Sequence, residues 1–598
     1  MVVVTAGHVD HGKSSLLRAL TGMEPDRTEE EQRRGLTIDL GFVWTDVPDA
    51  PDAAGAAGAD ERVAFVDVPG HERFLTTALA GAGPAPAVLF AVAADGGWMP
   101  QSQEHAAALD ALGVRDGVLA VTRCDLADPA PALAQARAAL AGTGLAALPA
   151  VAVSARTGAG LDELNAALAA LRDRTPPARP KAPVRLWVDR AFARTGHGLV
   201  VTGTLREGAL ARGDVLETGP DQPPLTVRGL HELGRAVDRS AGPARVAVNL
   251  RGQAPAEGLR GRALCTPGTY ALCDTVDVRL YGPLLARIPA RFTVHLGSAA
   301  VPARVRRFGR GTARLVLARA LPLRVGDRAV VTEHRRVVGS AVVLDPAPPP
   351  VGPRSAGALR ADALADHPGT PDVEHETAAR RFVRADALRR IGVDCAAATP
   401  VAGDWLVAPD ERRRVAAEAL AATVDAGGEP VDAGALARRL GLPDRALLAA
   451  LLPAELAVRS GRVVPAAAAD PLPAAARELV ESMEGALARG EFLAPTPAEL
   501  TALGVGRREL ALAVQTGRLV RLSETVHVAA ELPAAAARAL APLAGSPFTV
   551  SQARHTWNVP RRIALPLIEH LDRTGVTRRG SDDLRTVHPT GKTRERRA

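Results

Sequence analysis

The chain has 598 residues, of which 47% are hydrophobic, so it is long enough for several domains with packed cores. Its four cysteines form no CxxC pair, which excludes a disulfide framework and a thiolate metal site and indicates a reducing, cytoplasmic setting. The formal net charge is +7, and residues 544–598 contribute +6 of it through 11 basic and 5 acidic residues. This concentration favours a polyanionic partner such as nucleic acid, with a solvated tail as the alternative. No apolar run is long enough for a membrane span, so we expect a soluble protein.

The first 175 residues alternate short apolar runs with helical stretches. The runs that read as buried parallel strands are residues 2–6, 63–68, 88–93, 118–122 and 150–153, and those that read as helices include 14–20 and 161–171. This alternation predicts a doubly wound α/β domain over residues 1–175. Residues 48–60 are rich in Ala, Gly and Asp and are interpreted as an inserted hairpin tip.

A phosphate-binding loop connects the first predicted strand to the first predicted helix. Residues 7–14 read GHVDHGKS, the G-x4-G-K-S pattern in its required strand–loop–helix context. Backbone N–H groups of such a loop face the β-phosphate, Lys13 reaches the β- and γ-phosphates, and the Ser14 hydroxyl is offered to Mg²⁺. The loop residues expected to bind nucleotide are Gly7, His8, Val9, Asp10, His11, Gly12, Lys13, Ser14 and Ser15. A metal-binding pair formed by His8 and His11 is the alternative use of those two side chains.

Four further residues are expected around the γ-phosphate. Asp67 ends a predicted strand and can hold the Mg²⁺ shell, while the Gly70 amide can sense the γ-phosphate. His71 follows and can orient the attacking water, which makes it the predicted catalytic residue. Thr37, within the RGLTI segment at residues 34–38, is placed to close over Mg²⁺ as a switch.

Guanine rather than adenine is predicted as the base. Asp125 follows a buried strand in the segment TRCD (residues 122–125), and its carboxylate can accept from both N1–H and the exocyclic amine of guanine. Thr122 and Arg123 stand where an N-K-x-D motif has Asn and Lys. Arg123 can still stack on the base, whereas Thr122 is expected to lose one structural hydrogen bond. The second base-contacting segment, again after a predicted strand, is Ser154, Ala155 and Arg156.

Residues beyond the first domain change in character twice. Short β-type runs broken by Gly-Asp turns predict two β-barrels, over residues 182–269 and 270–346. After a proline-rich linker the chain becomes helical, and a unit of helix, turn, helix and hairpin recurs. This repeat predicts four winged-helix modules over residues 354–418, 419–470, 471–533 and 534–592, with a generic helical array as the alternative.

Several of these motifs resemble those of the translational GTPases of the elongation factor Tu class. They are the loop at residues 7–14, the switch at 34–38, DVPGHERF at 67–74 and DGGWMPQSQEH at 95–105. Within that class, DVPGHERF, the MPQ-x-x-EH segment and VDRAFARTGHGLVVTGT at 188–204 resemble the selenocysteine-specific elongation factors of the SelB family. The resemblance extends through both barrels into the winged-helix modules.

This resemblance implies a function and its partners. A GTPase of the SelB family delivers selenocysteinyl-tRNA, in its GTP form, to a ribosome at UGA codons marked by an mRNA hairpin. The implied cofactors are GTP and Mg²⁺, and a monomer is expected. By motif match, Asp189, Arg190 and Arg245 form the aminoacyl pocket, in which cationic groups favour the readily ionised selenol over serine's hydroxyl. Ordinary ion pairs on a barrel rim are the alternative.

The last module is predicted to bind the mRNA hairpin. Its second helix is expected to start at Arg561 and Arg562, with Asn558 as its cap, and Pro566 is expected to kink or shorten its first turn. Phosphates and a splayed base suit arginines at a helix start and a wing turn. The arginines expected to contact RNA are Arg561, Arg562, Arg573, Arg578 and Arg579. The alternative is a solvated basic face, and the first three modules show a weaker charge bias.

Two other functions compete with the one that the resemblance implies. One is another tRNA-delivering translational GTPase with an unrelated winged-helix extension. The other is a non-translational switch whose winged helices bind DNA, although two predicted barrels are not needed for that role.

Overall fold

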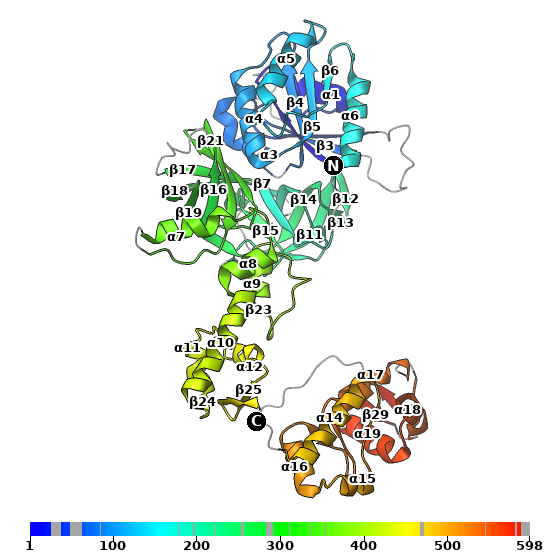
Figure 1. The fold of residues 1–598 in the computed structure, drawn as a ribbon. Coiled ribbons are helices and arrows are strands. Elements are labelled where there is room, and N and C mark those ends of the chain that lie inside the picture. Colours follow the sequence, from blue (N-terminus) through cyan, green and yellow to red (C-terminus); the bar gives the residue numbers. More distant parts are fainter. Residues whose placement is uncertain are drawn as a thin grey trace. The chain divides into compact units, whose positions relative to one another are not determined.

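The computed structural model describes most of the chain as two compact units, residues 1–413 and 414–598, which are treated separately (Figure 1). The described residues are 1–25, 37–47, 62–83, 85–176, 179–194, 198–219, 222–252, 256–282, 291–309, 311–334, 336–352, 355–427, 429–466, 472–543, 546–580 and 583–587. The predicted insertion at 48–60 and residues 34–36 of the switch lie outside them. Within the described range, no helix combines the length and the apolar character needed to cross a bilayer.

The N-terminal domain is a six-stranded sheet in the order β2-β3-β1-β4-β5-β6, with helices on both faces. The strands are β1 (Val2–Ala6), β2 (Gly41–Asp46), β3 (Arg62–Asp67), β4 (Ala87–Ala93), β5 (Asp116–Thr122) and β6 (Ala150–Ala152). The helices are α1 (Lys13–Thr21), α3 (Leu75–Ala82), α4 (Pro100–Leu112), α5 (Pro129–Leu140) and α6 (Leu161–Arg174). All pairings are parallel except that β2 runs antiparallel to β3 at the edge. The predicted doubly wound α/β fold is therefore confirmed.

Alternation along the central strand β4 explains the two layers of helices. Val88 and Phe90 enter a core that contains residues of α3, α4 and α5, whereas Ala87 and Leu89 enter the opposite core with α1 and α6. Successive side chains of a strand point to opposite faces, so a continuous apolar run requires cover on both sides. This layering leaves the carboxyl ends of the strands open for loops.

The next two domains are built from antiparallel strands. Residues 185–265 form a seven-stranded sheet, with the path β10-β11-β14-β8-β7-β15 and β12 beside β11, and a single bridge between Glu217 and Cys265 brings its edges together. Its strands, with the separate pair β9 and β13, are β7 (Arg185–Arg194), β8 (Gly198–Leu205), β9 (Ala209–Ala211), β10 (Val215–Leu216), β11 (Leu225–Glu232), β12 (Arg235–Val237), β13 (Arg239–Ala241), β14 (Ala244–Arg251) and β15 (Ala263–Cys265). The first predicted barrel is thus a nearly closed sheet.

The second barrel is closed, in the order β16-β19-β18-β17-β20-β21. Its strands are β16 (Leu272–Tyr281), β17 (Arg291–Leu296), β18 (Ala299–Gly309), β19 (Thr312–Pro322), β20 (Arg328–Glu333) and β21 (Arg336–Asp345). It packs on the GTPase-like domain through an apolar cluster in which Leu75, Leu79 and Ala108 meet Val330. Burial of such a cluster favours a defined contact between α3, α4 and the barrel.

Buried ion pairs attach the first helical elements to the closed barrel. Arg360 of α7 (Ser355–Ala365) contacts Asp277 at 2.7 Å and Asp345 at 2.6 Å. Arg380 of α8 (Val373–Arg380) contacts Asp345 at 2.7 Å and also pairs with Glu376. Removing one partner from such a network leaves an uncompensated buried charge, so these contacts hold α7 and α8 against the barrel.

The rest of the chain repeats the helix–turn–helix and hairpin unit. The first module has β22 (Phe382–Arg384), α9 (Ala385–Arg390), β23 (Trp405–Val407) and α10 (Pro409–Asp425), and the second has β24 (Val431–Asp432), α11 (Ala433–Arg439), α12 (Ala446–Leu451), β25 (Leu456–Arg459) and β26 (Arg462–Pro465). Helix α10 runs without interruption across the predicted boundary at residue 418. The exact module limits therefore stay predictions.

The third and fourth modules share one hydrophobic core, which extends from Leu472 to Leu571. The third has α14 (Ala474–Ala488), α15 (Pro497–Ala502), α16 (Arg507–Gln515), β27 (Leu519–Arg521) and β28 (His527–Ala529). The fourth has α17 (Leu532–Ala539), α18 (Val550–Trp557), α19 (Arg561–Arg573), β29 (Thr577–Arg579) and β30 (Arg585–Val587). Because the core is continuous, these two modules form a single block.

Two local predictions for the last module are wrong. Asn558 does not cap α19 but ends α18 in a left-handed conformation with φ of 49°, and Pro560 occupies the cap position of α19. Helix α19 also begins at Arg561 and continues through Pro566, so its first turn is not shortened. Burial of Ile563 and Leu567 supplies packing that outweighs the hydrogen bond lost at the proline.

Candidate functional site

The loop between β1 and α1 has the backbone of a phosphate cradle. Gly12 precedes α1 with φ of 73°, and Gly7 has φ of 125°. A Cβ on Gly7 would lie 2.2 Å from the Ala91 carbonyl oxygen, so no side chain fits there. The Lys13 ammonium donates to the carbonyls of Gly7 at 3.2 Å and His8 at 2.7 Å, which holds it along the loop. Ser15 lies at the edge of the same site and lines the adjoining cavity.

Helix α4 supports this loop from behind. The Val9 amide donates to Gln101 Oε1 at 3.0 Å, and the Gly7 amide donates to His105 Nδ1 at 3.2 Å. Burial lowers the pKa of His105 to about 3, so its ring is neutral and Nδ1 can accept a hydrogen bond. Sequence reasoning assigned these two residues no role. Their i, i+4 spacing, which places both side chains on one face of a helix, was the available signal.

Three oxygen-bearing side chains converge beside the loop. Ser14 Oγ donates to Asp67 Oδ2 at 2.8 Å and lies 3.1 Å from Thr37 Oγ1. Asp67 is completely buried, and its other oxygen accepts from the Thr5 hydroxyl at 2.7 Å. Hydroxyl and carboxylate oxygens are the donors that Mg²⁺ prefers, so Ser14, Thr37 and Asp67 fit a magnesium ion bound together with phosphates.

The segment after β3 lies directly against the phosphate loop. A Cβ on Gly70 would approach Lys13 Nζ to 2.6 Å and the Val9 amide nitrogen to 2.8 Å. Only a residue without a side chain permits this approach. His71 comes next, half-buried, and its Nδ1 accepts from the Arg73 amide at 3.2 Å. The predicted catalytic residue is thus adjacent in the chain to the backbone that touches Lys13.

The alternative reading of His8 and His11 as a metal-binding pair finds no support in the described part of the chain. Their ring centroids lie 5.2 Å apart, and burial lowers the pKa of His11 to about 4. Its Nδ1 faces the Ala91 carbonyl at 3.3 Å. Among the described residues, no group of three or more His, Cys, Asp and Glu side chains could hold a metal ion.

A cavity of about 600 Å³ adjoins the phosphate loop on the side of β5. Its lining comes from α1, the loop after β5 and the loop after β6, and consists of Gly12, Ser15, Arg18, Ala19, Thr122, Arg123, Asp125, Leu126, Ala155 and Arg156. Both predicted base-recognition segments meet here, and the buried Ser154 donates to Asp125 of the lining. The cavity has the position expected for the base and ribose of a nucleotide.

Neighbouring side chains hold Asp125 in place and favour its ionised form. It accepts from Ser154 Oγ at 2.6 Å and from Arg156 Nε at 2.9 Å. The hydrogen bond from Ser154, and then that from Arg156, lower the pKa of Asp125 below its ordinary value. An ionised carboxylate at this position is suited to accept two N–H groups of guanine.

Thr122 and Arg123 retain structural roles despite departing from the usual motif. The Thr122 hydroxyl donates to the His11 carbonyl at 2.8 Å, which connects the base-binding loop to the phosphate loop. The expected loss of a structural hydrogen bond is therefore offset by this contact. Arg123 has φ of 56° and pairs with Asp95 at 3.2 Å, which fixes its guanidinium at the cavity.

The three predicted pocket residues on the first β-domain lie together. Arg245 forms a two-pronged pair with Asp189, whose Oδ1 accepts from Arg245 Nη2 and from the Thr202 hydroxyl, both at 2.8 Å. Asp189 is only 2% exposed. Such a buried carboxylate fixes the guanidinium plane in one orientation.

Phe42 of the GTPase-like domain completes this cluster. The Arg245 guanidinium carbon lies 3.8 Å from the centroid of the Phe42 ring, and that of Arg190 lies 4.9 Å from it. Arg190 also pairs with Asp39 at 2.9 Å and donates to the Leu40 carbonyl. Sequence reasoning missed Phe42 and Asp39, because no local pattern places residues that follow the switch beside a separate β-domain.

The arginines predicted to contact RNA differ in their surroundings. All five are exposed, but two of them make contacts within the chain. Arg562 donates to the Ala494 carbonyl at 2.5 Å, and so it attaches the fourth module to the third. Arg579 pairs with Asp583, and both wing arginines lie on strand β29 rather than in the turn. Arg562 thus also has a structural role, and its RNA contact stays a prediction.

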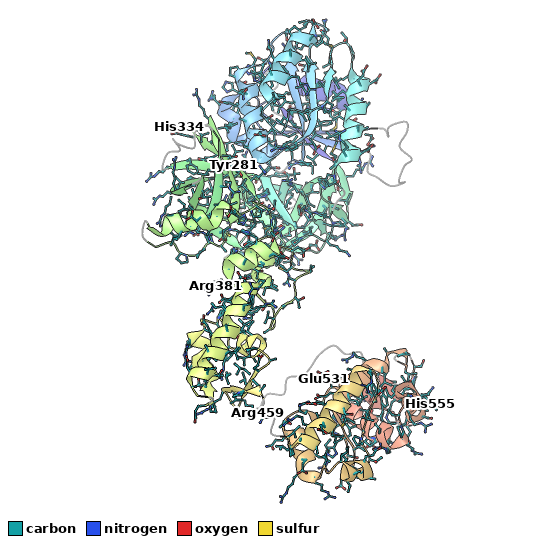
Figure 2. All side chains as sticks on the ribbon, in the orientation of Figure 1. Tyr281, His334, Arg381, Arg459, Glu531 and His555 are labelled. Carbon is teal, nitrogen blue, oxygen red and sulfur yellow. The ribbon has the colours of Figure 1, made fainter. Side chains whose placement is uncertain are left out.

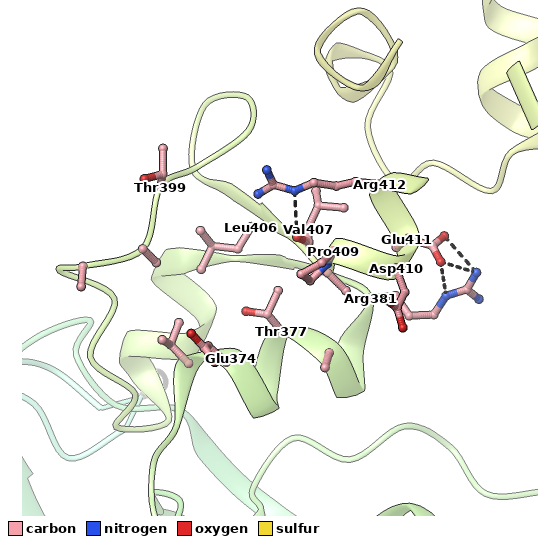
Figure 3. Close-up of a pocket in the computed structure, with 15 residues that line it drawn as sticks. Glu374, Thr377, Arg381, Thr399, Leu406, Val407, Pro409, Asp410, Glu411 and Arg412 are labelled. Carbon is pink, nitrogen blue, oxygen red and sulfur yellow. Dashed lines mark hydrogen bonds and ion pairs between the residues drawn. The ribbon is translucent and has the colours of Figure 1, made fainter. Parts of the chain in front are cut away.

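A second cavity, of about 770 Å³, lies in the first winged-helix module between α8, β23 and the start of α10 (Figure 3). Arg381, with φ of 66°, contacts Glu411 through Nε and Nη2, both at 2.9 Å. Arg412 Nε donates to the Val407 carbonyl at 3.1 Å. None of the predicted site residues lines this cavity.

Two segments of the chain match known protein families. Residues 1–174 match the family described as "Elongation factor Tu GTP binding domain", and residues 543–586 match "Elongation factor SelB, winged helix". A selenocysteine-specific elongation factor of Desulfomicrobium baculatum is 38% identical over 55% of this chain and 53% of its own length. That of Escherichia coli is 34% identical over 58% of this chain and 55% of its own length. The chain thus spans about half the length of the curated relatives it matches.

A solved structure covers nearly the whole chain. The bacterial selenocysteine-specific elongation factor EF-Sec superposes on 98% of this chain and 100% of its own, with a TM-score of 0.65 and 25% identity. The chain is similar to the selenocysteine-specific elongation factors in sequence and in fold. Residues 1–174 match the GTP-binding domain of elongation factor Tu, and the segment that matches the SelB winged helix contains α18, α19 and most of the wing of β29 and β30.

Proposed function

We propose that the chain is a cytoplasmic, monomeric translation factor that delivers selenocysteinyl-tRNA to the ribosome at UGA codons marked by an mRNA hairpin, and hydrolyses GTP in doing so. The observation that carries this proposal is the guanidinium of Arg245, fixed by Asp189 and placed over Phe42. A selenol ionises far more readily than a hydroxyl, so a rigid cation discriminates selenocysteine from its serine precursor.

The nucleotide is proposed to bind with its base at Asp125 and its phosphates at the loop that contains Lys13. The carboxylate of Asp125 accepts from N1–H and the exocyclic amine of guanine, while Ser154 keeps it oriented at 2.6 Å. Loop amides and Lys13 bind the phosphates. Ser14 and Thr37, with Asp67 behind them, would hold Mg²⁺, which neutralises phosphate charge when bound.

His71 is the residue proposed to orient the attacking water. It follows Gly70, whose backbone lies so close to Lys13 that a Cβ would come within 2.6 Å of Nζ. A γ-phosphate contacting the Gly70 amide therefore sets the position of the next side chain. Catalysis of this kind rests on placing the water in line with the phosphorus rather than on covalent chemistry.

The aminoacyl pocket is joined to the nucleotide through one short segment. Thr37 faces Ser14 at 3.1 Å, and Asp39 pairs with Arg190 at 2.9 Å two residues later. Phe42 then supports Arg190 and Arg245. A shift of this segment with the nucleotide changes the surroundings of both cations, which supports GTP-dependent binding of the aminoacyl group.

The fourth module is the proposed hairpin-binding site. Arg561 starts α19, Arg578 lies on β29 and Arg573 ends α19, and all three are exposed. Arg554 and His555 at the end of α18 add cationic and aromatic character next to the turn, and His555 is labelled in Figure 2. Such an arrangement suits backbone phosphates and an unstacked base.

The decisive experiment compares selenocysteinyl-tRNA with seryl-tRNA, both on the same tRNA, in the presence of GTP and of GDP. We expect tight binding only of the selenocysteinyl form with GTP. Arg245→Leu should abolish this preference, whereas Arg251→Leu, on the same strand β14, should retain it. Equal affinity of the wild type for both aminoacyl forms would contradict the proposal and favour another tRNA-delivering GTPase.

A further inference from the structure

The wing of the second winged-helix module brings two like charges together. Strands β25 and β26 are joined through Ser460 and Gly461, which have φ of 46° and 77°. The register places Arg459 directly opposite Arg462. Like charges opposite each other across an antiparallel pair destabilise the hairpin, so this arrangement is costly for the fold alone.

A third guanidinium reaches the same place. Arg445 precedes α12, and its Nη2 lies 3.7 Å from the position that a Cβ on Gly461 would occupy. We call Arg445, Arg459 and Arg462 the arginine tip. Figure 2 labels Arg459 on this hairpin. Arg445 and Arg462 are exposed and Arg459 is half-buried.

The carboxylates nearest the tip serve as caps, and Asp432, opposite Arg462 across β24 and β26, accepts from the Ala435 amide at 2.7 Å. Arg439, outside the tip, has Asp425 at 4.0 Å, whereas none of the ion pairs found in the described residues involves an arginine of the tip. Asp444 accepts from the Ala446 amide at 2.9 Å as a turn cap. The positive charge of the tip is thus not neutralised by the ion pairs of the module itself.

The formal charge of the second winged-helix module does not reveal the arginine tip. Residues 414–466 contain six arginines and six acidic residues, a formal balance of 6 − 6 = 0. Five of the six arginines end α11 or flank the turn and wing, together with three of the carboxylates, while Glu418, Asp425 and Glu429 lie on or just after α10. Residues 431–466 therefore carry a formal charge of 5 − 3 = +2, although the module as a whole is neutral.

We propose that the arginine tip binds the sugar–phosphate backbone of an RNA duplex, apart from the hairpin site of the fourth module. Guanidinium forks bind phosphates in two-pronged fashion, and three of them at the junction of a helix start and a wing can straddle neighbouring phosphates. The wing faces contribute no aromatic side chain for stacking a base, which favours backbone over base recognition. The choice of RNA rests on the proposed function.

The test uses the full chain and a 20-base-pair RNA duplex that lacks any hairpin loop, with affinity measured by fluorescence anisotropy across a salt series. The variant carries Arg445→Gln, Arg459→Gln and Arg462→Gln together. Each phosphate contact contributes roughly 0.7–0.9 to the slope of log affinity against log salt, so the slope should fall by about 2–3. The thermal midpoint should stay the same or rise, because like-charge repulsion is removed.

The matched control replaces three exposed arginines that each have a carboxylate partner, Arg384, Arg413 and Arg489, by Gln. It loses the same formal charge and should keep the wild-type slope to within about one unit. An unchanged slope and affinity for the tip variant would overturn the proposal. Loss of polyglutamate binding without loss of RNA binding would overturn it as well, because the tip would then bind an acidic protein.

Failure of the proposed function is recognised separately. The same preparations are assayed for hairpin binding and for GTP-dependent preference for selenocysteinyl-tRNA, neither of which should change in the tip variant. A wild type without that preference refutes the delivery function, and the duplex measurement still decides the role of the tip.

Discussion

Replacement of Asp125 by Asn tests the guanine site most directly. In the structure its carboxylate accepts from Ser154 Oγ at 2.6 Å and Arg156 Nε at 2.9 Å, and these contacts lower its pKa. Asn keeps the shape and an acceptor for Ser154. It loses the charge and presents an NH₂ group where guanine presents N–H donors.

The expected loss can be estimated from the hydrogen bonds. Two bonds from guanine to a charged acceptor contribute roughly 1.5–3 kcal/mol each, so the substitution costs roughly 3–6 kcal/mol, or about 10²- to 10⁴-fold in affinity. Xanthine carries a carbonyl where guanine carries its amine, so its nucleotide should gain from the new NH₂ donor.

The assay is competition of GTP, XTP and ATP against a fluorescent guanine nucleotide. Asp125→Asn should weaken GTP, strengthen XTP and leave ATP weak. An unchanged GTP affinity would refute the role of Asp125. Equal loss of every nucleotide, with a lowered thermal midpoint, would show that the carboxylate serves only to hold Ser154 and Arg156.

Three further outcomes are expected. His71→Ala should leave GTP affinity unchanged and slow ribosome-stimulated hydrolysis by about 10²-fold or more, measured as phosphate release; equal rates would exclude a catalytic role. Arg561→Glu should weaken hairpin binding without loss of stability, whereas Arg562→Glu should lower the thermal midpoint of the 472–587 block, because Arg562 donates to the Ala494 carbonyl; the reverse pattern would contradict this assignment. Burial lowers the pKa of His105 from 6.5 to about 3, so between these pH values the unfolded chain binds more protons than the folded chain. The contribution of His105 to folding stability is therefore fully present above pH 6.5 and is lost as the pH falls towards 3. His105→Gln should flatten this dependence in melting curves, and an unaltered curve would show that another group dominates.

The nucleotide site was largely predictable because its elements are local. Gly7, Lys13 and Asp67 follow or flank short buried strands, and the carboxyl ends of parallel strands meet at one edge of a sheet. Asp125 was identified for the same reason. The support of the phosphate loop by α4 could not be predicted from local patterns. The hydrogen bond from the Gly7 amide to His105 joins residues that are 98 positions apart in the chain.

In the first β-domain and the winged helices, local sequence patterns predict the elements but not the contacts between them. The sequence by itself determined the α/β class, the antiparallel domains, the repeated helix–turn–helix units and most residues of the phosphate loop, since each depends on periodicity or spacing within a few residues. Tertiary structure alone placed Phe42 under Arg245, turned Arg562 into a contact between modules and gathered the arginine tip in a module of zero net charge. These contacts join side chains from separate segments, and their geometry depends on how whole elements pack rather than on any run of neighbouring residues.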